Sequence, residues 1–335
     1  MSLLAEVVPV LAHEIRANDL ISLVSTCRAL RALQALPLDL SDKCRHAAEL
    51  LRAARVHGPR FTISHLHVDR CDQQQQLDSL FALPGLASVS VRSGRGVSRL
   101  PVSSSLSTLR LLSDVGASLA RLESVSSCPA LHTLVIHTLE SLSAAAGAAA
   151  LADLAAAPSL RSLELRKLRH VSDLSPLATG TAKWQLTWLG LQGCRSLRDV
   201  SPLARLRSLE ELDLSSCPAI KSVSALGACK QLRQLRATGC TALVDVTGLA
   251  ACTALQTLYL TACTSLRDVG ELATCRALHT LHLGRCKSVV DVSDLGRCES
   301  LRVLNLRCSG ATVIPRRDGL HVEFDVPTLV ASLFS

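Results

Sequence analysis

Leucine recurs every 23 residues along the second half of this chain. Six leucines keep this spacing without a slip, namely Leu186, Leu209, Leu232, Leu255, Leu278 and Leu301. Their surroundings repeat with them as L-x-x-L-x-L-x-x-C-x-x-L-x-D-V-x-x-L-x-x-C, a pattern that is complete between Leu255 and Cys275. A unit of this length cannot bury its apolar face alone, so successive units must stack on one another. The chain is therefore expected to fold as a solenoid.

Less regular copies of the same unit precede the uniform ones. They begin at Ile63, Leu86, Leu106, Leu131 and Leu160, which makes eleven units in all. Within each unit the alternating L-x-L segment predicts a short strand that pairs in parallel with the next unit. The second half of each unit predicts a short helix or 3₁₀ turn. In the unit that starts at Leu131, the alanine-rich stretch from Ala144 to Ala157 predicts a true helix.

The repeats divide the chain into three parts. Residues 1–58 show helical periodicity and are expected to cap the first unit, residues 59–312 hold the repeats, and residues 313–335 form a C-terminal cap with a strand-like piece from Leu320 to Val326. Ser175 and Ser201, each followed by proline, are expected to cap the free amides of two helical turns. Gln73 to Gln76 are expected to form a solvated loop.

Composition narrows the kind of core and the kind of partner. Aromatic residues make up only 2% of the chain, so the core must be aliphatic and filled by periodic packing. The net charge of +8 permits acidic partners. Nucleic acid is a less favoured partner because the chain offers few aromatic rings for stacking and no recognised nucleic-acid motif. The uncharged run from Ser141 to Ala152 is too short to cross a bilayer, so no membrane contact is expected.

Most of the cysteines occupy two fixed positions of the repeat. One set is Cys194, Cys217, Cys240, Cys263 and Cys286, and the other is Cys229, Cys252, Cys275 and Cys298. A small apolar side chain suits a buried tight turn, which predicts reduced structural cysteines. The alternatives are zinc, which the long intervals between the two sets disfavour, and disulfides between neighbouring units, which need an oxidising compartment.

An aspartate also recurs at one repeat position. Its members are Asp173, Asp199, Asp245, Asp268 and Asp291. Acid and base chemistry needs two carboxylates in different environments, whereas these five share one environment. They are expected to cap the turn before the helical segment. With no recognised catalytic motif, the sequence predicts no enzyme, no cofactor and no metal.

The repeat resembles that of leucine-rich repeat proteins, with a cysteine where many members carry asparagine, as in the cysteine-containing subfamily. This resemblance implies an α/β solenoid of horseshoe shape, with a parallel sheet on the concave side and short helices or turns on the convex side. Part of the unit, from Asp199 to Ala204, also resembles the shorter repeats of internalin-type and phosphatase-regulatory proteins.

The N-terminal segment resembles an F-box. The residues that match its pattern without gaps include Leu3, Glu6, Val7, Leu11, Ile15, Asp19, Leu20, Leu23 and Cys27. In that family such residues dock on a Skp-family adaptor of a cullin ubiquitin ligase, so the resemblance implies the same role here. Leu4 replaces the usual early proline and Leu30 the common tryptophan. The alternative is a plain helical cap.

The positions between the strand leucines are expected to face outward along the concave sheet, because side chains alternate across a strand. The twelve residues predicted to form a partner-binding face are Glu164, Arg166, Trp188, Gln192, Glu211, Asp213, Gln234, Arg236, Thr257, Tyr259, His282 and Arg307. Trp188 and Tyr259 are candidate anchors, with packing over neighbouring units as the alternative.

These features predict a non-enzymatic protein-binding module, and the F-box resemblance implies a role as the substrate-recognition subunit of a cullin-type ligase. The alternatives are a scaffold subunit of a cytoskeletal, ciliary or ribonucleoprotein assembly, or a phosphatase-regulatory repeat protein. The N-terminal stretch lacks the basic region of a signal peptide and contains Glu6. With its reduced cysteines, the chain is expected to be intracellular and cytoplasmic, and a nuclear or cytoskeletal location is also compatible.

Overall fold

The computed structural model describes residues 64–71, 73–83, 85–93, 96–112, 119, 122–137, 143–178 and 185–324. The chain divides into two compact units, one of residues 1–142 with 156–160 and the other of residues 143–155 with 161–335. The F-box-like segment of residues 1–58 lies outside the described residues, as does the end of the C-terminal cap from residue 325. Its predicted adaptor-binding residues therefore stay predictions.

The described part of the first unit holds four parallel strands and two helical segments. Its elements in chain order are β1 (His65–Arg70), α4 (Gln74–Phe81), β2 (Ser88–Ser93), β3 (Thr108–Leu111), the 3₁₀ helix η4 (Glu123–Ser127) and β4 (Thr133–Ile136). Each strand pairs in parallel with the next along the chain. Equivalent repeat positions lie opposite one another, as Ser88 and Thr108 do.

The described part of the second unit holds eight parallel strands. Its elements are α5 (Ala144–Ala155), β5 (Ser162–Leu165), α6 (Ser175–Ala178), β6 (Trp188–Gly190), η5 (Ser201–Arg205), β7 (Glu211–Asp213), η6 (Ser224–Ala228), β8 (Gln234–Arg236), η7 (Thr247–Ala251), β9 (Thr257–Tyr259), η8 (Gly270–Thr274), β10 (Thr280–His282), η9 (Ser293–Arg297), β11 (Val303–Asn305) and β12 (His321–Glu323). Neighbouring strands from β5 to β12 pair in parallel and in register.

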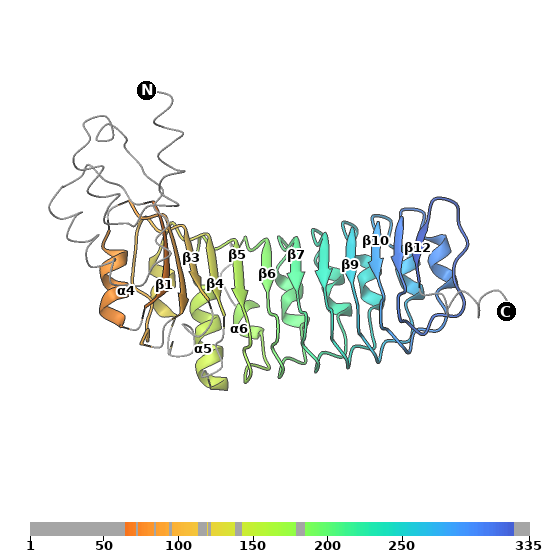
Figure 1. Cartoon of the computed structure of the whole chain (residues 1–335), viewed down its shortest axis with the longest axis horizontal. Coiled ribbons are helices and arrows are strands. Elements are labelled where there is room, and N and C mark those ends of the chain that lie inside the picture. The colour runs from red at the N-terminus through yellow and green to blue at the C-terminus, as the bar shows by residue number, and fades with distance from the viewer. Residues whose placement is uncertain are drawn as a thin grey trace, which may run out of the picture. The chain divides into compact units, whose positions relative to one another are not determined.

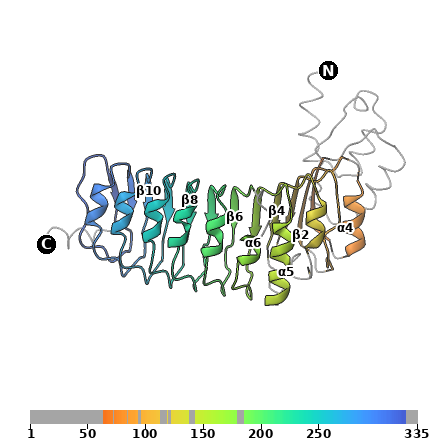
Figure 2. The same cartoon turned by 180° about the vertical axis from the view of Figure 1, so that it is seen from behind.

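The repeat period correctly placed the strands. Each of the eleven predicted repeats contains a strand that begins two residues after the first residue of the repeat, as β9 does after Leu255. The helix predicted from Ala144 ends at Ala155, and the strand-like piece near the C-terminus is β12. Helical segments contact the helical segments of neighbouring repeats, and strands contact strands. Figures 1 and 2 show these two ladders from opposite sides.

The core lies between the strand ladder and the helical ladder. It is aliphatic, as the shortage of aromatic residues requires, and its repeated leucines such as Leu235, Leu258 and Leu281 are fully buried. Each strand has only three or four residues in the second unit, so a single repeat buries little apolar surface. Stability must therefore come from contacts between adjacent repeats. No helix in the described residues is long and apolar enough to cross a membrane.

A left-handed backbone conformation follows every strand of the second unit from β5 to β11. Glycine occupies this position twice, with φ of +73° at Gly193 and +75° at Gly239. The other five residues there are non-glycine, with φ between +55° and +60°, namely Lys167, Ser216, Ala262, Arg285 and Cys308. The amide of this residue continues the sheet ladder, as when Ala262 N–H donates to the Gly284 carbonyl at 2.8 Å. The turn thus keeps successive repeats in register.

The cysteine ladders are structural. In the first set each thiol donates to a carbonyl of the preceding repeat, as Cys240 does to Leu214 O at 3.2 Å and Cys286 to Leu260 O at 2.9 Å. The second set does the same, with Cys252 Sγ lying 3.1 Å from Leu226 O. These nine side chains are buried. The buried thiols therefore add hydrogen bonds between adjacent repeats, some of them to carbonyls that also accept a backbone amide, as Leu226 O does from Cys229 N–H.

Burial also raises the pKa of several of these thiols, which affects the stability of the folded protein at alkaline pH. It raises the pKa of Cys240 and Cys275 to about 12, and the pKa of Cys229, Cys252 and Cys286 to about 11. The folded pKa thus exceeds the unfolded value of 9.0. The unfolded state loses these protons first, so stability is full below pH 9 and falls as the pH rises towards 11 and 12.

We expect the urea midpoint to fall steeply between pH 9 and pH 11. Each thiol that titrates only on unfolding contributes a slope of up to about 1.4 kcal/mol per pH unit. Cys252→Ala with Cys275→Ala removes two such protons and should flatten the pH dependence, whatever its effect on stability at pH 7. An unchanged slope in this variant would show that these thiols are not the cause.

The aspartate ladder caps the helical turns, as predicted. The carboxylate of Asp199 accepts from Ser201 N–H at 2.8 Å, and Asp268 and Asp291 accept equivalently from Gly270 and Ser293. The hydrogen bond from the Ser293 backbone lowers the pKa of Asp291. The prediction that Ser201 itself caps the turn was wrong: its hydroxyl donates to Asp199 instead of accepting from an amide.

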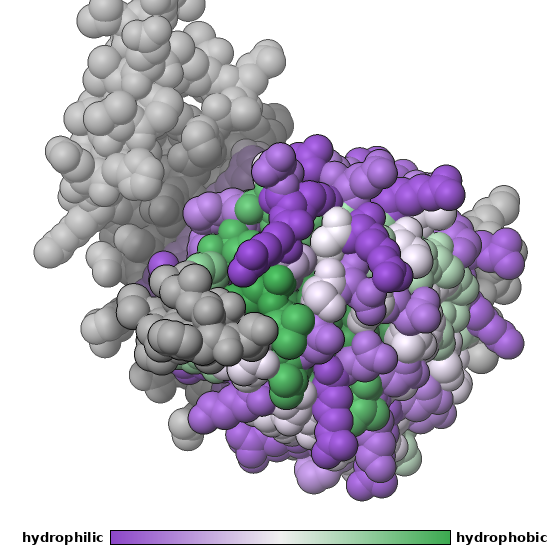
Figure 3. Space-filling view, turned by 90° about the vertical axis from the view of Figure 1, so that its right-hand side faces the viewer, coloured by the Kyte–Doolittle hydropathy of each residue, from purple (hydrophilic) through white to green (hydrophobic). Residues whose placement is uncertain are grey.

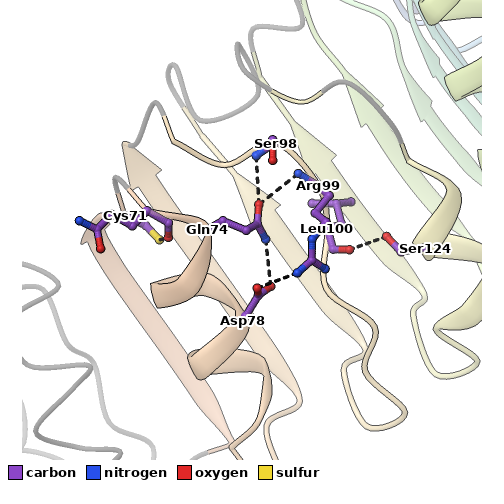
Figure 4. Close-up of polar contacts among 8 residues, drawn as sticks. Cys71, Gln74, Asp78, Ser98, Arg99, Leu100 and Ser124 are labelled. Atoms are coloured by element: carbon purple, nitrogen blue, oxygen red, sulfur yellow. Dashed lines mark hydrogen bonds and ion pairs between the residues drawn. The ribbon is translucent and has the colours of Figure 1, made fainter.

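The run Gln73 to Gln76 in the first repeat does not form a solvated loop, so this prediction was also wrong. Gln74 begins helix α4, and its side-chain oxygen accepts from the backbone amides of Ser98 and Arg99 at 3.0 and 3.2 Å (Figure 4). Its amide nitrogen donates to Asp78, which in turn binds the Arg99 guanidinium at 2.8 Å. The glutamine therefore joins the helix of one repeat to the next repeat.

The last described strand leaves an apolar end on the second unit. Figure 3 views this end and shows hydrophobic side chains at its centre with hydrophilic ones around them. Ile314, Leu320 and Val322 are only half-buried here, because no further strand of the described residues pairs beyond β12. Strand β12 is joined to β11 by pairing and by a 2.7 Å hydrogen bond from Asn305 Nδ2 to Glu323 Oε2. This region begins the predicted C-terminal cap.

Candidate functional site

The outward side chains of β5 to β12 form three parallel rows, which we call the strand face. The first row follows from the register of the strands and contains Trp188, Glu211, Gln234 and Thr257. The second row contains Glu164, Asp213, Arg236, Tyr259 and His282. Beyond the strands the third row contains Arg166, Gln192 and Arg307. All twelve predicted face residues thus lie in these rows, and whether they bind a partner stays a prediction.

Three residues of the second row form a stack. The Tyr259 and His282 rings lie face to face, with centroids 4.6 Å apart and planes 9° from parallel. The Arg236 guanidinium lies over the Tyr259 ring at 5.6 Å from its centroid, within the range of a cation–π interaction. In the amide orientation that satisfies both its oxygen and its nitrogen, Gln234 accepts from the Arg236 guanidinium through its side-chain oxygen. Tyr259 is therefore fixed between a cation and an imidazole while remaining half-exposed.

The surroundings of the His282 imidazole favour its neutral form. Burial lowers the pKa of His282, and the negative charge of Glu323 opposes that shift. A neutral ring stacks on tyrosine without the cost of burying a charge. Because the folded pKa lies below the unfolded value of 6.5, this contribution to stability is present above pH 6.5 and is lost as the pH falls.

Trp188 is arranged differently from Tyr259. A Cβ placed on Gly190 would lie 2.6 Å from Trp188 Cη2 and 3.1 Å from Glu164 Cγ. The indole therefore occupies the space that a side chain at position 190 would fill. Trp188 thus packs over Gly190 of its own strand β6, which agrees with a packing role more than with an anchor role. The tryptophan is nevertheless only half-buried.

This arrangement makes a prediction for Gly190→Ala. The new methyl group cannot coexist with the indole, so the Trp188 ring must move outward into water. We expect a red shift of the tryptophan emission in a Trp184→Phe background, with a change in unfolding free energy of about 1 kcal/mol or less. Gly284→Ala in the same background is the matched control. An unshifted emission from Gly190→Ala would contradict the placement of the ring.

Two charged residues of the predicted face lie in its outward rows but are buried beneath neighbouring side chains. Asp213 is 7% exposed and Glu164 is 9% exposed. Asp213 accepts from Gln192 Nε2 at 2.6 Å and from Ser215 N–H at 2.8 Å. Glu164 pairs with Arg166. Both carboxylates are thus engaged by neighbouring side chains and contribute little exposed charge to the strand face.

Sequence reasoning missed a group of cations beside this face. A cavity of about 360 Å³ lies where the chain leaves β5, β6 and β7. It is lined by Arg166, Lys167, Arg169, Gln192, Gly193, Arg195 and Ser216. Aligning the repeats would have shown the signal, since Arg169 and Arg195 share one repeat position in consecutive units. No group of histidine, cysteine or acidic side chains within the described residues could hold a metal ion.

Comparison with known proteins supports the fold. No protein-family model matches the chain, and no curated protein sequence matches it. Among solved structures, an internalin, InlF of Listeria monocytogenes, has a TM-score of 0.54 at 17% identity and covers 86% of this chain and 92% of its own. The functional domain of InlJ from the same organism, described as including a cysteine ladder, has a TM-score of 0.50 at 15% identity and covers 90% and 67%.

At sequence identities this low, the structural similarity supports a shared fold only. The parallel strands, the 23-residue period and the helical ladder agree with that architecture. The chain therefore has the leucine-rich repeat fold.

Proposed function

We propose that this chain is a non-enzymatic module that binds a protein partner on the strand face of β6 to β11. The observation that carries the proposal is the stack of Arg236, Tyr259 and His282. Tyrosine and arginine are the residue types that contribute most at protein interfaces. Here they are held rigid before a partner arrives, so little side-chain entropy is lost on binding.

The surroundings of the stack suit a protein surface. The three residues are half-exposed, and Thr257 and Thr280 beside them offer hydroxyl groups. A large aromatic anchor ringed by small polar groups is typical of the centre of an interface. The repeated titratable groups have other tasks, because the aspartates cap turns and the ladder thiols donate to carbonyls. This supports binding in preference to catalysis.

The test is affinity purification of the full chain from its native cells with quantitative mass spectrometry. Wild type is compared with the double variant Trp188→Ala plus Tyr259→Ala. The control is a second double variant, Lys221→Ala plus Arg267→Ala, whose two residues are exposed at a different position of the repeat. We expect a partner that the control retains and the face variant loses. If both variants retain every partner equally, the strand face is not the binding surface.

A finer part of the proposal concerns residues 1–58. Their gapless F-box-like pattern supports docking of a Skp-family adaptor, which would make the chain the substrate-recognition subunit of a cullin-type ligase. Purification with and without residues 1–58 tests this. Recovery of the adaptor by the full chain alone supports it. Absence of the adaptor from both, with stable co-fractionation in a large assembly, favours the scaffold alternative.

A further inference from the structure

Strand β12 forms one end of the sheet in the part of the chain that the structure describes. One edge of β12 pairs with β11 over three residues, and no described strand pairs with its other edge. Strands β6 to β11 each pair over three residues on both edges, so β12 is long enough to pair once more. It contains no proline and no lysine, which are residues that commonly block an exposed edge. Such an edge is a template for another strand.

The backbone groups of β12 alternate between its two edges. His321 N–H donates to Arg302 O of the preceding repeat at 2.7 Å. Glu323 O accepts from Leu306 N–H at 2.7 Å, so residues 321 and 323 both face β11. Val322 lies between them and therefore directs its N–H and its C=O to the open edge. Two copies related by a twofold axis at this point would exchange two N–H···O bonds between their Val322 residues, as a hydrogen-bonded pair of an antiparallel ladder does.

The same axis also matches the side chains of β12. An antiparallel register centred on Val322 places His321 of each copy opposite Glu323 of the other copy. The Asn305 amide donates to Glu323 at 2.7 Å and holds its carboxylate beside the strand face. A register centred on Glu323 would instead place two carboxylates opposite each other, which is destabilising. The strand is therefore complementary to itself in one register.

The apolar end described above lies directly beneath this edge. Leu304 is fully buried because β12 covers it, whereas its neighbour Val322 is only half-buried. Ile314, Leu320 and Phe324 are half-buried at the same end. Hydrophobic side chains at the centre with hydrophilic ones around them, as in Figure 3, are typical of a protein–protein interface. A twofold interface uses the same patch on both copies, so each apolar end would bury the other.

We propose that the chain forms a symmetric dimer in which β12 of one copy pairs antiparallel with β12 of a second copy. The twofold axis is perpendicular to the sheet, so the two strand ladders join into one sheet and the helical ladders of both copies lie on the same side of it. The two strand faces then open to the same side. This proposal goes beyond the proposed function and is independent of it, because the stack of Arg236, Tyr259 and His282 lies on other strands.

The first test is sedimentation equilibrium of the full chain, whose mass should rise with concentration towards twice 35.6 kDa. Val322→Pro removes the N–H at the open edge and should weaken the dimer about tenfold or more. The unfolding midpoint should stay close to wild type, because the ladder with β11 does not use that N–H. The matched control is Asp318→Pro in the adjacent turn, where Gly319 follows with φ of +77° and proline is compatible. This control should dimerise as wild type does.

The second test probes the register with two charge variants. His321→Glu places carboxylates opposite each other, and Glu323→Lys removes the acid that faces His321. Each variant alone should dimerise about tenfold more weakly, because the twofold axis repeats every change. In an equal mixture the new carboxylate of one variant faces the new ammonium group of the other. Native mass spectrometry should then show heterodimers in excess of both homodimers.

Three outcomes would overturn the proposal. A wild-type chain that stays monomeric at its highest soluble concentration shows that the edge does not pair with a second copy. If that monomer dimerises only after residues 325–335 are removed, the edge belongs to this segment of the chain. Equal dimerisation of wild type and Val322→Pro, with no excess of heterodimers in the mixture, places the interface elsewhere. None of these outcomes affects the proposed function, which the loss of native partners from the Trp188 and Tyr259 variant tests separately.

Discussion

Leu260→Asp is expected to unfold the repeats around β9. Leu260 is fully buried, and the equivalent positions of the adjacent repeats, Ala237 and Leu283, are buried as well. An unpaired charge among them costs several kcal/mol, because burial removes its hydration and the described residues place no buried cation beside it. In a solenoid each repeat depends on its neighbours, so the damage should spread to β8 and β10. We expect urea unfolding to begin well below the wild-type midpoint.

Two variants make this prediction specific. Thr264→Asp adds the same charge at an exposed position of the same repeat and should change the unfolding free energy by about 0.5 kcal/mol or less. Leu260→Met keeps the volume and the apolar character and should cost less than about 1.5 kcal/mol. Hydrogen exchange would locate the damage at β8 to β10. A midpoint for Leu260→Asp equal to that of Thr264→Asp would contradict the account of the core.

Tyr259→Ala is expected to weaken partner binding about 30-fold, measured as Kd with the partner recovered from native cells. Truncation of a central aromatic anchor costs about 2 kcal/mol or more, which corresponds to that factor. The variant also leaves the faces of Arg236 and His282 without their stacking partner. Because Tyr259 is half-exposed and the leucines beneath it remain, thermal unfolding should change little.

The difference between the two aromatic residues sharpens this prediction. The Trp188 indole covers Gly190, so Trp188→Ala should weaken binding less than Tyr259→Ala does, by under about tenfold. Tyr259→Phe retains the ring and should retain most of the affinity. Arg267→Ala lies elsewhere and should have no effect. A larger loss for Trp188→Ala than for Tyr259→Ala would mean that the interface is centred on β6 instead of β9.

The regular parts of the fold could be predicted because they follow from one period. A leucine at a fixed position of each repeat determines where the strand begins, so β9 could be placed from Leu255. The structural roles of Asp199 and Cys240 were predictable for the same reason, because each repeat places the equivalent residue in the same surroundings. The helix that begins at Gln74 was missed because the first repeat departs from the pattern. Its hydrogen bonds to Ser98 and Arg99 also join residues that are 24 and 25 positions apart in the sequence.

The details of the strand face could not be read from the period. Alternation shows that Asp213 and Tyr259 point away from the core, but their exposure depends on the residues of adjacent strands. Gln192 covers Asp213, whereas His282 and Arg236 leave an edge of Tyr259 open. Such contacts depend on pairs of residues at least 20 positions apart. The cation-lined cavity was missed likewise, because three different repeats contribute to it.

The most direct measurement of the central claim is photo-crosslinking in native cells. A photoreactive amino acid is placed at position 259 on the strand face, at position 282 beside it, and at exposed position 267 as the control. The account predicts that positions 259 and 282 crosslink to the same protein and that position 267 does not. Crosslinks to that protein from position 267 alone would contradict it.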